Sequence, residues 1–252
     1  MRRAVIHSYG GGVQSAAVAV LVVQGKLPRP ERVVMADTGR EAALTWKYLA
    51  ECVQPLLATT GLRVEIASHS LATVDMYPKA GGRPLIPAFT AEKQRLPSFC
   101  SVEWKRRVVH RWLRAEGYGP ARPVTQWLGI SVDETARART FPVSWAMVAY
   151  PLLDMGLTRT ACIQLVERAG LPRPPRSSCW MCPFRLDAEW MAMRERNDGD
   201  WDKALEMDAS IRDTGNGGLY LHRSAKPLAA VEFRHEHQRD LFDVCEEGRC
   251  EF

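Results

Sequence analysis

The 252-residue sequence contains no long hydrophobic run, since no apolar stretch reaches the roughly 18 residues that a membrane-spanning helix requires. The apolar residues after the first arginines are too few for the core of a secretion signal, and glycines follow them at once. Repeats and low-complexity tracts are also missing. These absences exclude membrane and solenoid classes, and we expect a cytoplasmic, globular protein that does not contact a membrane.

Lysine is scarce: the chain has 7 lysines against 27 arginines, and its formal net charge is +5. The planar guanidinium group binds two oxygens of a phosphate or carboxylate at once. A GC-rich genome, whose codons favour arginine, is the alternative explanation. The charge therefore allows a nucleotide or nucleic-acid partner without requiring one.

Seven cysteines without a secretion signal indicate a reducing compartment rather than a disulfide framework. Cys52 and Cys162 fall in helical, apolar-periodic segments and are expected in the core. The other five lie in loop-like or terminal contexts, and they are Cys100, Cys179, Cys182, Cys245 and Cys250.

Short β patterns alternate with helical patterns in the first half of the chain. We predict strands at residues 4–9, 32–36, 63–67 and 124–130, and helices at 13–23, 41–57, 102–116 and 158–169. This alternation predicts an α/β fold with a mostly parallel central sheet and helices on both faces. Residues 70–97 are expected to form a long irregular loop. Prolines around residue 175 predict a boundary between an α/β domain (1–175) and a cysteine-bearing C-terminal region (176–252) packed on it, with two helices within 186–212.

A glycine-rich segment joins the first predicted strand to the first predicted helix. It reads Ser8-Tyr9-Gly10-Gly11-Gly12-Val13-Gln14-Ser15. Glycines let backbone N–H groups approach an anion, and a helix N-terminus adds a positive dipole. The pattern is neither a Walker A motif nor Gly-x-Gly-x-x-Gly. We predict a phosphate site here, the alternative being a turn that only lets the helix pack on the sheet.

This segment resembles the PP-loop superfamily of adenine-nucleotide α-hydrolase-like proteins, and within it the phosphoadenosine-phosphosulfate (PAPS) reductase family. The usual motif reads Ser-Gly-Gly-x-Asp-Ser, and Gln14 stands in the Asp position, as the reductase branch allows. The resemblance implies a Rossmann-like fold and an adenine nucleotide: ATP, adenylyl sulfate (APS) or its 3′-phosphate (PAPS). The nucleotide-binding residues that it implies are Ser8, Gly10, Gly11, Gly12, Gln14, Ser15, Asp37 and Gly129.

The resemblance continues beyond this loop. Asp37-Thr38-Gly39 is similar to the family's segment after the second strand, where Asp37 either bonds the nucleoside or caps the next helix. Lys105, five residues after Cys100, is similar to a family lysine. Gly129-Ile130-Ser131, followed by Arg137, is similar to the segment that holds the phosphate or sulfonate. The resemblance thus implies catalytic roles for Lys105 and Arg137.

Cys179-Trp-Met-Cys182 is followed by proline, and a Cys-x-x-Cys pair suits a metal, an iron–sulfur cluster or a redox dithiol. The family resemblance implies a [4Fe–4S] cluster held by Cys100, Cys179 and Cys182. Cys245 is a candidate fourth ligand. Zinc and bare thiols are the alternatives.

Cys250 lies two residues before the end of the chain, and it resembles by position a nucleophilic cysteine that the reductases carry close to the C-terminus. The resemblance implies that Cys250 attacks a sulfonate sulfur, and a fourth metal ligand or a frayed tail is the alternative. His222, His235 and His237 have no catalytic spacing and are expected at the surface.

Two enzymatic versions follow from the resemblance. In the first, a sulfonucleotide is reduced and sulfite is released, with a thiol-reductant protein closing the cycle. In the second, ATP activates an acceptor, such as a nucleic acid, and sulfur from a donor displaces AMP. A different class is a non-catalytic nucleotide- or metal-binding subunit of a nucleic-acid modification complex. An oligomer is compatible with all three.

Overall fold

The computed structural model describes residues 3–77, 82–138, 143–212 and 218–234, and the chain divides into two compact units. Unit 1 comprises Met1–Leu71 and Trp104–Ser177, and unit 2 comprises Ala72–Glu103 and Ser178–Phe252. The predicted division at residue 175 differs from this, because Ala72–Glu103 groups with the C-terminal residues. The reason is local pairing: β4 (Phe89–Thr90) forms an antiparallel ladder with β7 (Leu219–Tyr220).

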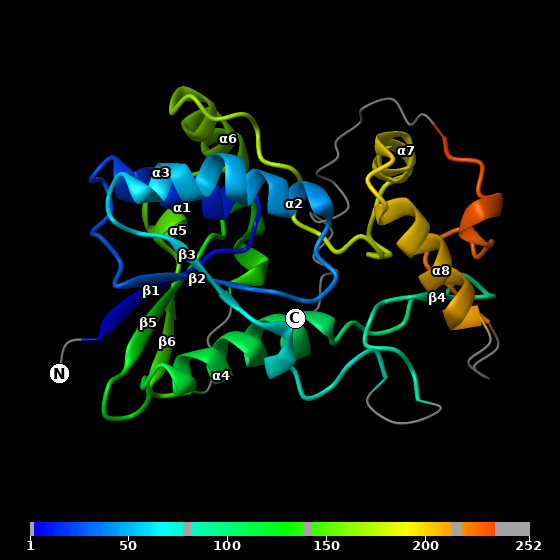
Figure 1. The fold of residues 1–252 in the computed structure, drawn as a ribbon, viewed down its shortest axis with the longest axis horizontal. Helices are drawn as coiled ribbons and strands as arrows, with labels where there is room; N and C mark the ends of the chain where they lie inside the picture. The colour runs from blue at the N-terminus through cyan, green and yellow to red at the C-terminus, as the bar shows by residue number, and fades with distance from the viewer. Residues whose placement is uncertain (1–2, 78–81, 139–142, 213–217, 235–252) are drawn as a thin grey trace. The chain divides into compact units, whose positions relative to one another are not determined.

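Unit 1 is built on a five-stranded, all-parallel sheet with the strand order β3-β2-β1-β5-β6 (Figure 1). Its strands are β1 (Ala4–Ser8), β2 (Arg32–Ala36), β3 (Val64–Ala67), β5 (Val124–Leu128) and β6 (Ala146–Ala149). Val33, Val34 and Met35 of β2 are all buried, as expected for a strand covered on both faces. The predicted α/β class with a parallel central sheet is confirmed.

Helices cover both faces of this sheet (Figure 1). One face carries α1 (Val13–Val23), α2 (Ala43–Tyr48), α3 (Gln54–Ala58), α5 (Pro151–Asp154) and α6 (Arg159–Arg168), and the other carries α4 (Arg107–Ala115). A π-helical stretch, Leu49–Val53, joins α2 to α3, and another, Ser101–Arg106, precedes α4. In the part of the chain that the structure describes, no helix combines the length and the apolar character needed to cross a membrane.

Helix α1 forms the centre of the core of unit 1. Every residue of α1 from Val13 to Val22 is buried, because the helix lies between the sheet and α6. Alanines at positions 16, 17 and 19 keep its surface small enough for close packing. Thr158, the first residue of the predicted helix 158–169, caps α6, since its Oγ1 accepts a hydrogen bond from the Ala161 N–H at 3.2 Å.

Unit 2 is organised by two buried aspartates on helices α7 (Asp187–Arg196) and α8 (Asp200–Arg212), both of which fall within the predicted range 186–212. Asp208 accepts hydrogen bonds from the backbone N–H groups of Leu221 (2.9 Å) and Leu228 (2.8 Å). Asp187 lies 3.2 Å from Nε2 of His222, which is only 4% exposed. The predicted surface location of His222 is therefore wrong, because its partner lies 35 residues away in sequence. His235 and His237 lie outside the described residues.

Candidate functional site

The segments after β1 and β5 leave the same edge of the sheet where the strand order reverses. β2 and β3 lie on one side of β1, whereas β5 and β6 lie on the other. Open α/β sheets bind ligands outside the carboxyl ends of the strands at such a reversal point. The glycine loop, defined here as residues 9–15, follows β1 at this point. The fold therefore places the loop where a ligand site is expected.

The glycine loop is held in one conformation by short contacts. Gly11 has φ +80, a backbone conformation that L side chains rarely adopt. A Cβ at Gly11 would lie 2.8 Å from Cγ2 of Thr45 and 3.0 Å from Oγ of Ser177. Ser177 Oγ also donates a hydrogen bond to the Gly10 carbonyl. The first glycines of the loop are thus required for both the backbone path and the packing.

Ser15 closes the loop onto α1. The Gly12 N–H donates to Ser15 Oγ (3.2 Å), and this hydroxyl donates to the Gly12 carbonyl (2.9 Å). Helix α1 is eleven residues long, and its first-turn N–H groups have no intrahelical acceptors. The loop and the helix start therefore present backbone donors and a positive dipole at one place.

Gly129, directly after β5, lies against the first turn of α1. A Cβ at this position would lie 2.7 Å from the Ser15 nitrogen and 2.8 Å from the Gln14 carbonyl carbon. Both are backbone atoms, which cannot move aside as a flexible side chain can. Glycine at position 129 thus lets the end of β5 and the glycine loop approach each other. Both segments contain residues that the resemblance implies for nucleotide binding.

Gln14 of the glycine loop is buried and bridges several polar groups. Its Nε2 donates to Glu134 Oε2 (2.9 Å) and to Ser131 Oγ (3.4 Å). Its Oε1 accepts from Arg159 at 3.0 Å. Arg137, a predicted catalytic residue, forms an ion pair with Glu134 Oε1 at 2.7 Å. The loop after β5 thereby brings Arg137 within one residue of Gln14 in a continuous hydrogen-bonded network.

Lys105, the other predicted catalytic residue in the described part of the chain, pairs with a carboxylate that sequence reasoning missed. Its Nζ lies 3.1 Å from Oε1 of Glu41, whose side chain has no exposed area. Thr38 donates a hydroxyl hydrogen bond to the same oxygen at 3.3 Å. A buried carboxylate costs several kcal/mol unless it is paired. Glu41 therefore fixes the ammonium group at the carboxyl end of β2, and only the three-dimensional contact identifies it.

Asp37 and Ser8, two predicted nucleotide-binding residues, have local partners. Asp37 Oδ1 accepts a hydrogen bond from the Gly39 N–H (2.7 Å), which stabilises the turn after β2. Ser8 Oγ donates to Gln126 Oε1 on β5 at 3.3 Å. Both residues lie at the carboxyl edge of the sheet beside the glycine loop. The predicted nucleotide-binding residues of unit 1 are thus collected along this one edge.

His7, one residue before the end of β1, is a second residue that sequence reasoning missed. It is fully buried, and its Nε2 lies 3.1 Å from the Ser15 carbonyl oxygen. Burial lowers the pKa of His7 from 6.5 to about 4, so the imidazole is neutral at pH 7. Because the Ser15 carbonyl is an acceptor, Nε2 carries the proton. His7 thus supports the start of α1 from inside the core.

The three described loop cysteines all belong to unit 2. Cys179 and Cys182 form a tight turn, in which the Cys182 N–H donates to the Cys179 carbonyl at 3.1 Å. Arg185 donates to the Cys179 carbonyl at 3.0 Å and thereby holds the turn. Cys100 Sγ lies 3.5 Å from Ser98 Oγ. All three thiols are free of disulfides.

These thiols do not by themselves form the predicted metal centre. Among residues 3–77, 82–138, 143–212 and 218–234, no group of three or more Cys, His, Asp or Glu side chains is arranged to hold a metal ion. Cys245, the candidate fourth ligand, and Cys250, the predicted nucleophile, lie outside the described residues. The [4Fe–4S] cluster and its zinc alternative therefore stay predictions, and we derive no reaction step through them. Iron, zinc and sulfide analysis of anaerobically purified protein measures them directly.

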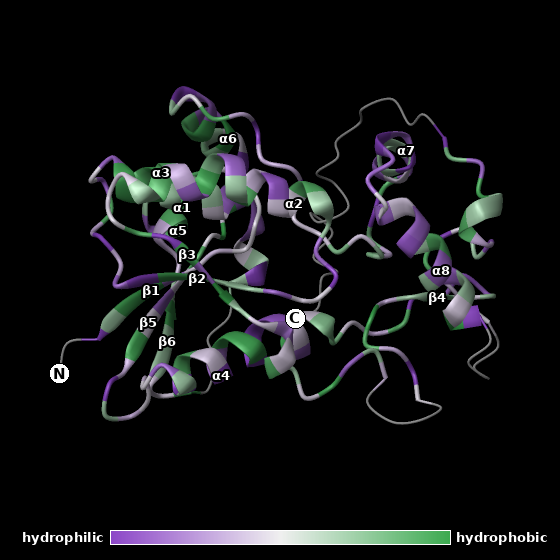
Figure 2. Cartoon of the chain, viewed as in Figure 1, coloured by the Kyte–Doolittle hydropathy of each residue, from purple (hydrophilic) through white to green (hydrophobic). Residues whose placement is uncertain are grey.

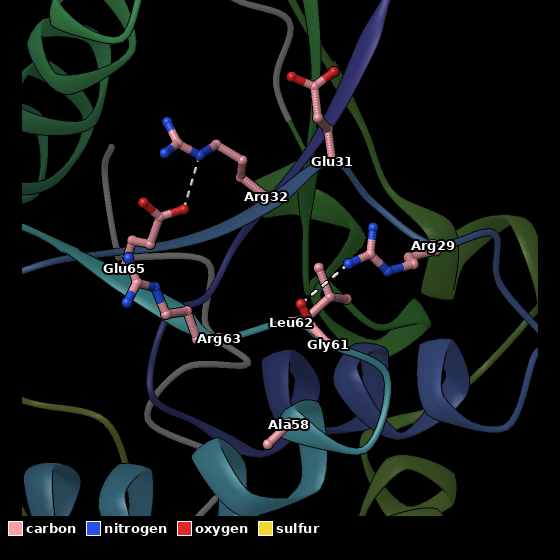
Figure 3. A pocket seen from close by; sticks show the side chains of 8 residues that line it. All are labelled: Arg29, Glu31, Arg32, Ala58, Gly61, Leu62, Arg63 and Glu65. Atoms are coloured by element: carbon pink, nitrogen blue, oxygen red, sulfur yellow. Dashed lines mark hydrogen bonds and ion pairs between the residues drawn. The ribbon is translucent and has the colours of Figure 1, made fainter.

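A separate pocket of about 380 Å³ lies at the opposite end of the strands (Figure 3). It is lined by Arg29, Glu31, Arg32, Ala58, Gly61, Leu62, Arg63 and Glu65. Its charged groups are largely engaged, since Arg32 pairs with Glu65 at 2.9 Å and Arg29 donates to the Gly61 carbonyl at 3.1 Å (Figure 3). The pocket lies beside the first residues of β2 and β3, away from the edge that carries the glycine loop.

Comparison with known proteins adds no family. The sequence matches no protein-family model, and no curated protein is significantly similar to it. The PAPS-reductase resemblance therefore depends on the motif residues themselves.

Proposed function

We propose that the protein binds an adenine nucleotide at the glycine loop and performs sulfur chemistry on it, as an enzyme of the PP-loop, PAPS-reductase type. One observation carries the proposal: a glycine-rich loop leads into α1 at the strand-order reversal, with Gly129 pressed against the first turn of the helix. Phosphate groups bind at helix N-termini of this kind, where backbone N–H groups and the helix dipole both favour an anion.

The side chains around the loop have roles that fit a phosphate or sulfonate. Arg137 and Arg159 bring positive charge to the network around Gln14. Lys105 brings a further cation to the end of β2, where Glu41 positions it. Cations placed around an anion site stabilise the negative charge that develops on a leaving phosphate or sulfonate.

The two versions of the chemistry differ in which bond is broken. In the first, the Cys250 thiolate attacks the sulfonate sulfur, the sulfur–oxygen bond to the nucleotide phosphate breaks, and AMP (or its 3′-phosphate) leaves with the electron pair. An external thiol then forms a disulfide with Cys250 and releases sulfite. In the second, an acceptor oxygen attacks the α-phosphorus of ATP and pyrophosphate leaves, after which a sulfur nucleophile displaces AMP. The basic residues of α4 favour the second version, because a nucleic acid acceptor carries phosphates.

We expect nucleotide binding at the loop to be independent of divalent metal. Gln14 provides no carboxylate, and both carboxylate oxygens of Glu134 are already bonded to Gln14 and Arg137. Titration calorimetry with ATP and with adenylyl sulfate should give affinities in excess EDTA that agree with those in Mg²⁺ within about twofold, or 0.4 kcal/mol. Binding that appears only with Mg²⁺ would show that this carboxylate arrangement is not the one used.

Product analysis after incubation of the protein with ATP or adenylyl sulfate distinguishes the two enzymatic versions from a non-catalytic subunit. Sulfite together with a sulfonate-sized mass increase on the tail supports the first version, and pyrophosphate with AMP supports the second. Nucleotide binding without any of these products, in the presence of a thiol and an oligonucleotide, supports the non-catalytic subunit.

A further inference from the structure

The solvent-facing side of α4 is basic along its whole length. Val108, Val109, Trp112 and Leu113 are buried against the sheet. The remaining positions carry Arg107, His110, Arg111 and Arg114, so that the ribbon of α4 alternates between hydrophobic and hydrophilic colours in Figure 2. From residue 105 to residue 115 the chain has five Lys and Arg residues and no Asp or Glu.

Arg111 and Arg114 each contact a neutral group on this side of the sheet. Arg111 donates to the Leu71 carbonyl at 2.7 Å, which is a neutral acceptor. Arg114 lies over the ring of Trp145, with its guanidinium carbon 5.7 Å from the ring centroid. The His110 ring lies 5.7 Å from the same Trp145 ring. The face therefore combines guanidinium groups with a partly exposed aromatic ring.

Helix α4 connects the two edges of the sheet. Just before its first turn, Trp104 contacts His69 and Lys105 pairs with Glu41, at the carboxyl ends of β3 and β2. At its last turn, Arg114 contacts Trp145, directly before β6 begins. The helix thus runs antiparallel to the strands (Figure 1), and its basic face starts at the edge that carries the glycine loop.

We propose that the basic face of α4, formed by Arg107, Arg111, Arg114 and the ring of Trp145, binds the phosphate backbone of a nucleic acid strand. The inference rests on the proposed function and identifies a nucleic acid as the acceptor of the sulfur. A strand bound along α4 would have one end directed to the nucleotide site. Arginines at i, i+4 and i+7 span about 10 Å along a helix, a length that covers successive phosphates of a strand. Arginine forks bind phosphate oxygens in pairs, and an aromatic ring adds a stacking surface for a base.

The test compares two double variants of the full chain that each lose two positive charges. Arg107→Gln/Arg114→Gln removes charge from α4, and Lys47→Gln/Arg168→Gln removes the same charge from exposed positions of α2 and α6 on the other face of the sheet. The probes are a 20-nucleotide single strand, as RNA and as DNA, and a 20-base-pair duplex. Their binding affinity is measured by fluorescence anisotropy over a range of salt concentrations.

We expect the wild type to bind a probe with a strong salt dependence. Each phosphate contact to a single strand contributes about 0.7 to the salt slope, which is about fivefold in affinity near 0.1 M salt. The α4 variant should therefore bind about 25-fold more weakly with a slope lower by about 1.4. The control variant should stay close to the wild type. The probe bound most tightly identifies single or double strands as the acceptor.

Three results would overturn the inference: no binding of any probe by the wild type, an equal loss in both variants, or binding only to anionic phosphatidylserine vesicles with the same dependence on α4. Circular dichroism of both variants excludes unfolding as the cause of a loss. A failure of the proposed function gives a different result. The wild-type protein would then bind oligonucleotides on α4 but would bind neither ATP nor adenylyl sulfate in calorimetry.

Discussion

Replacing Gly11 by Val should abolish binding of adenine nucleotides, with an affinity loss of more than about 100-fold, or 2.7 kcal/mol. A valine residue cannot adopt φ +80 without strain, and the valine Cβ would collide with Thr45 and Ser177. The backbone must then move, and the N–H groups of the loop lose the positions in which they face one anion. Titration calorimetry with ATP and adenylyl sulfate measures the loss.

Gly11→Val is also expected to lower the stability of the fold. A matched control separates this loss of stability from the loss of nucleotide binding. Gly117 has φ +82, close to the value of Gly11, and a Cβ there meets nothing within 4 Å. Gly117→Val therefore introduces the same backbone strain, about 1–2 kcal/mol, without a steric collision. Gly117 follows the C-terminus of α4, away from the glycine loop. The Gly117→Val protein should bind nucleotide as the wild type does. A folded Gly11→Val protein with wild-type affinity would mean that the glycine loop is only a turn.

Lowering the pH should destabilise the protein through His7. The pKa of this buried imidazole is lowered by desolvation to about 4, whereas it is 6.5 in the unfolded chain. Between these values the unfolded state binds more protons, so this contribution is fully present above pH 6.5 and is lost as the pH falls toward 4. The loss should reach about 2 kcal/mol at pH 5 and about 3 kcal/mol below pH 4.

Urea unfolding of the wild type and of His7→Gln between pH 7.5 and pH 4 measures this contribution. Carboxylates elsewhere also titrate below pH 5, so the difference between the two proteins is the relevant quantity. We expect the variant to be less stable at pH 7 and the gap to close as the pH falls. A gap that stays constant with pH would contradict a neutral, buried His7.

The sequence predicted the features of this fold that depend on local patterns. Alternating β and helical segments predicted the parallel sheet, and the helical pattern over residues 158–169 predicted α6, because periodicity acts within a few residues. The position of the glycine loop at the β1–α1 junction followed in the same way.

Contacts between residues far apart in sequence could not be predicted. Glu41 meets Lys105, which lies 64 residues later in the sequence, and no local pattern marks either residue as the partner of the other. His222 is likewise buried beside Asp187, which lies 35 residues earlier in the sequence. The grouping of Ala72–Glu103 with the C-terminal residues arises from a two-residue strand whose sequence, Phe89-Thr90, is too short to predict. Long-range pairing decided each of these cases.

The central claim, that the glycine loop binds the phosphates of an adenine nucleotide, is tested most directly by hydrogen–deuterium exchange with and without saturating adenylyl sulfate or ATP. Amide hydrogens that bond a phosphate exchange more slowly. The account predicts slower exchange in the peptide that covers residues 9–16, together with the segment around Gly129 that packs on it. Slower exchange confined to residues 58–65, at the pocket on the opposite edge, or no change at all, would contradict it.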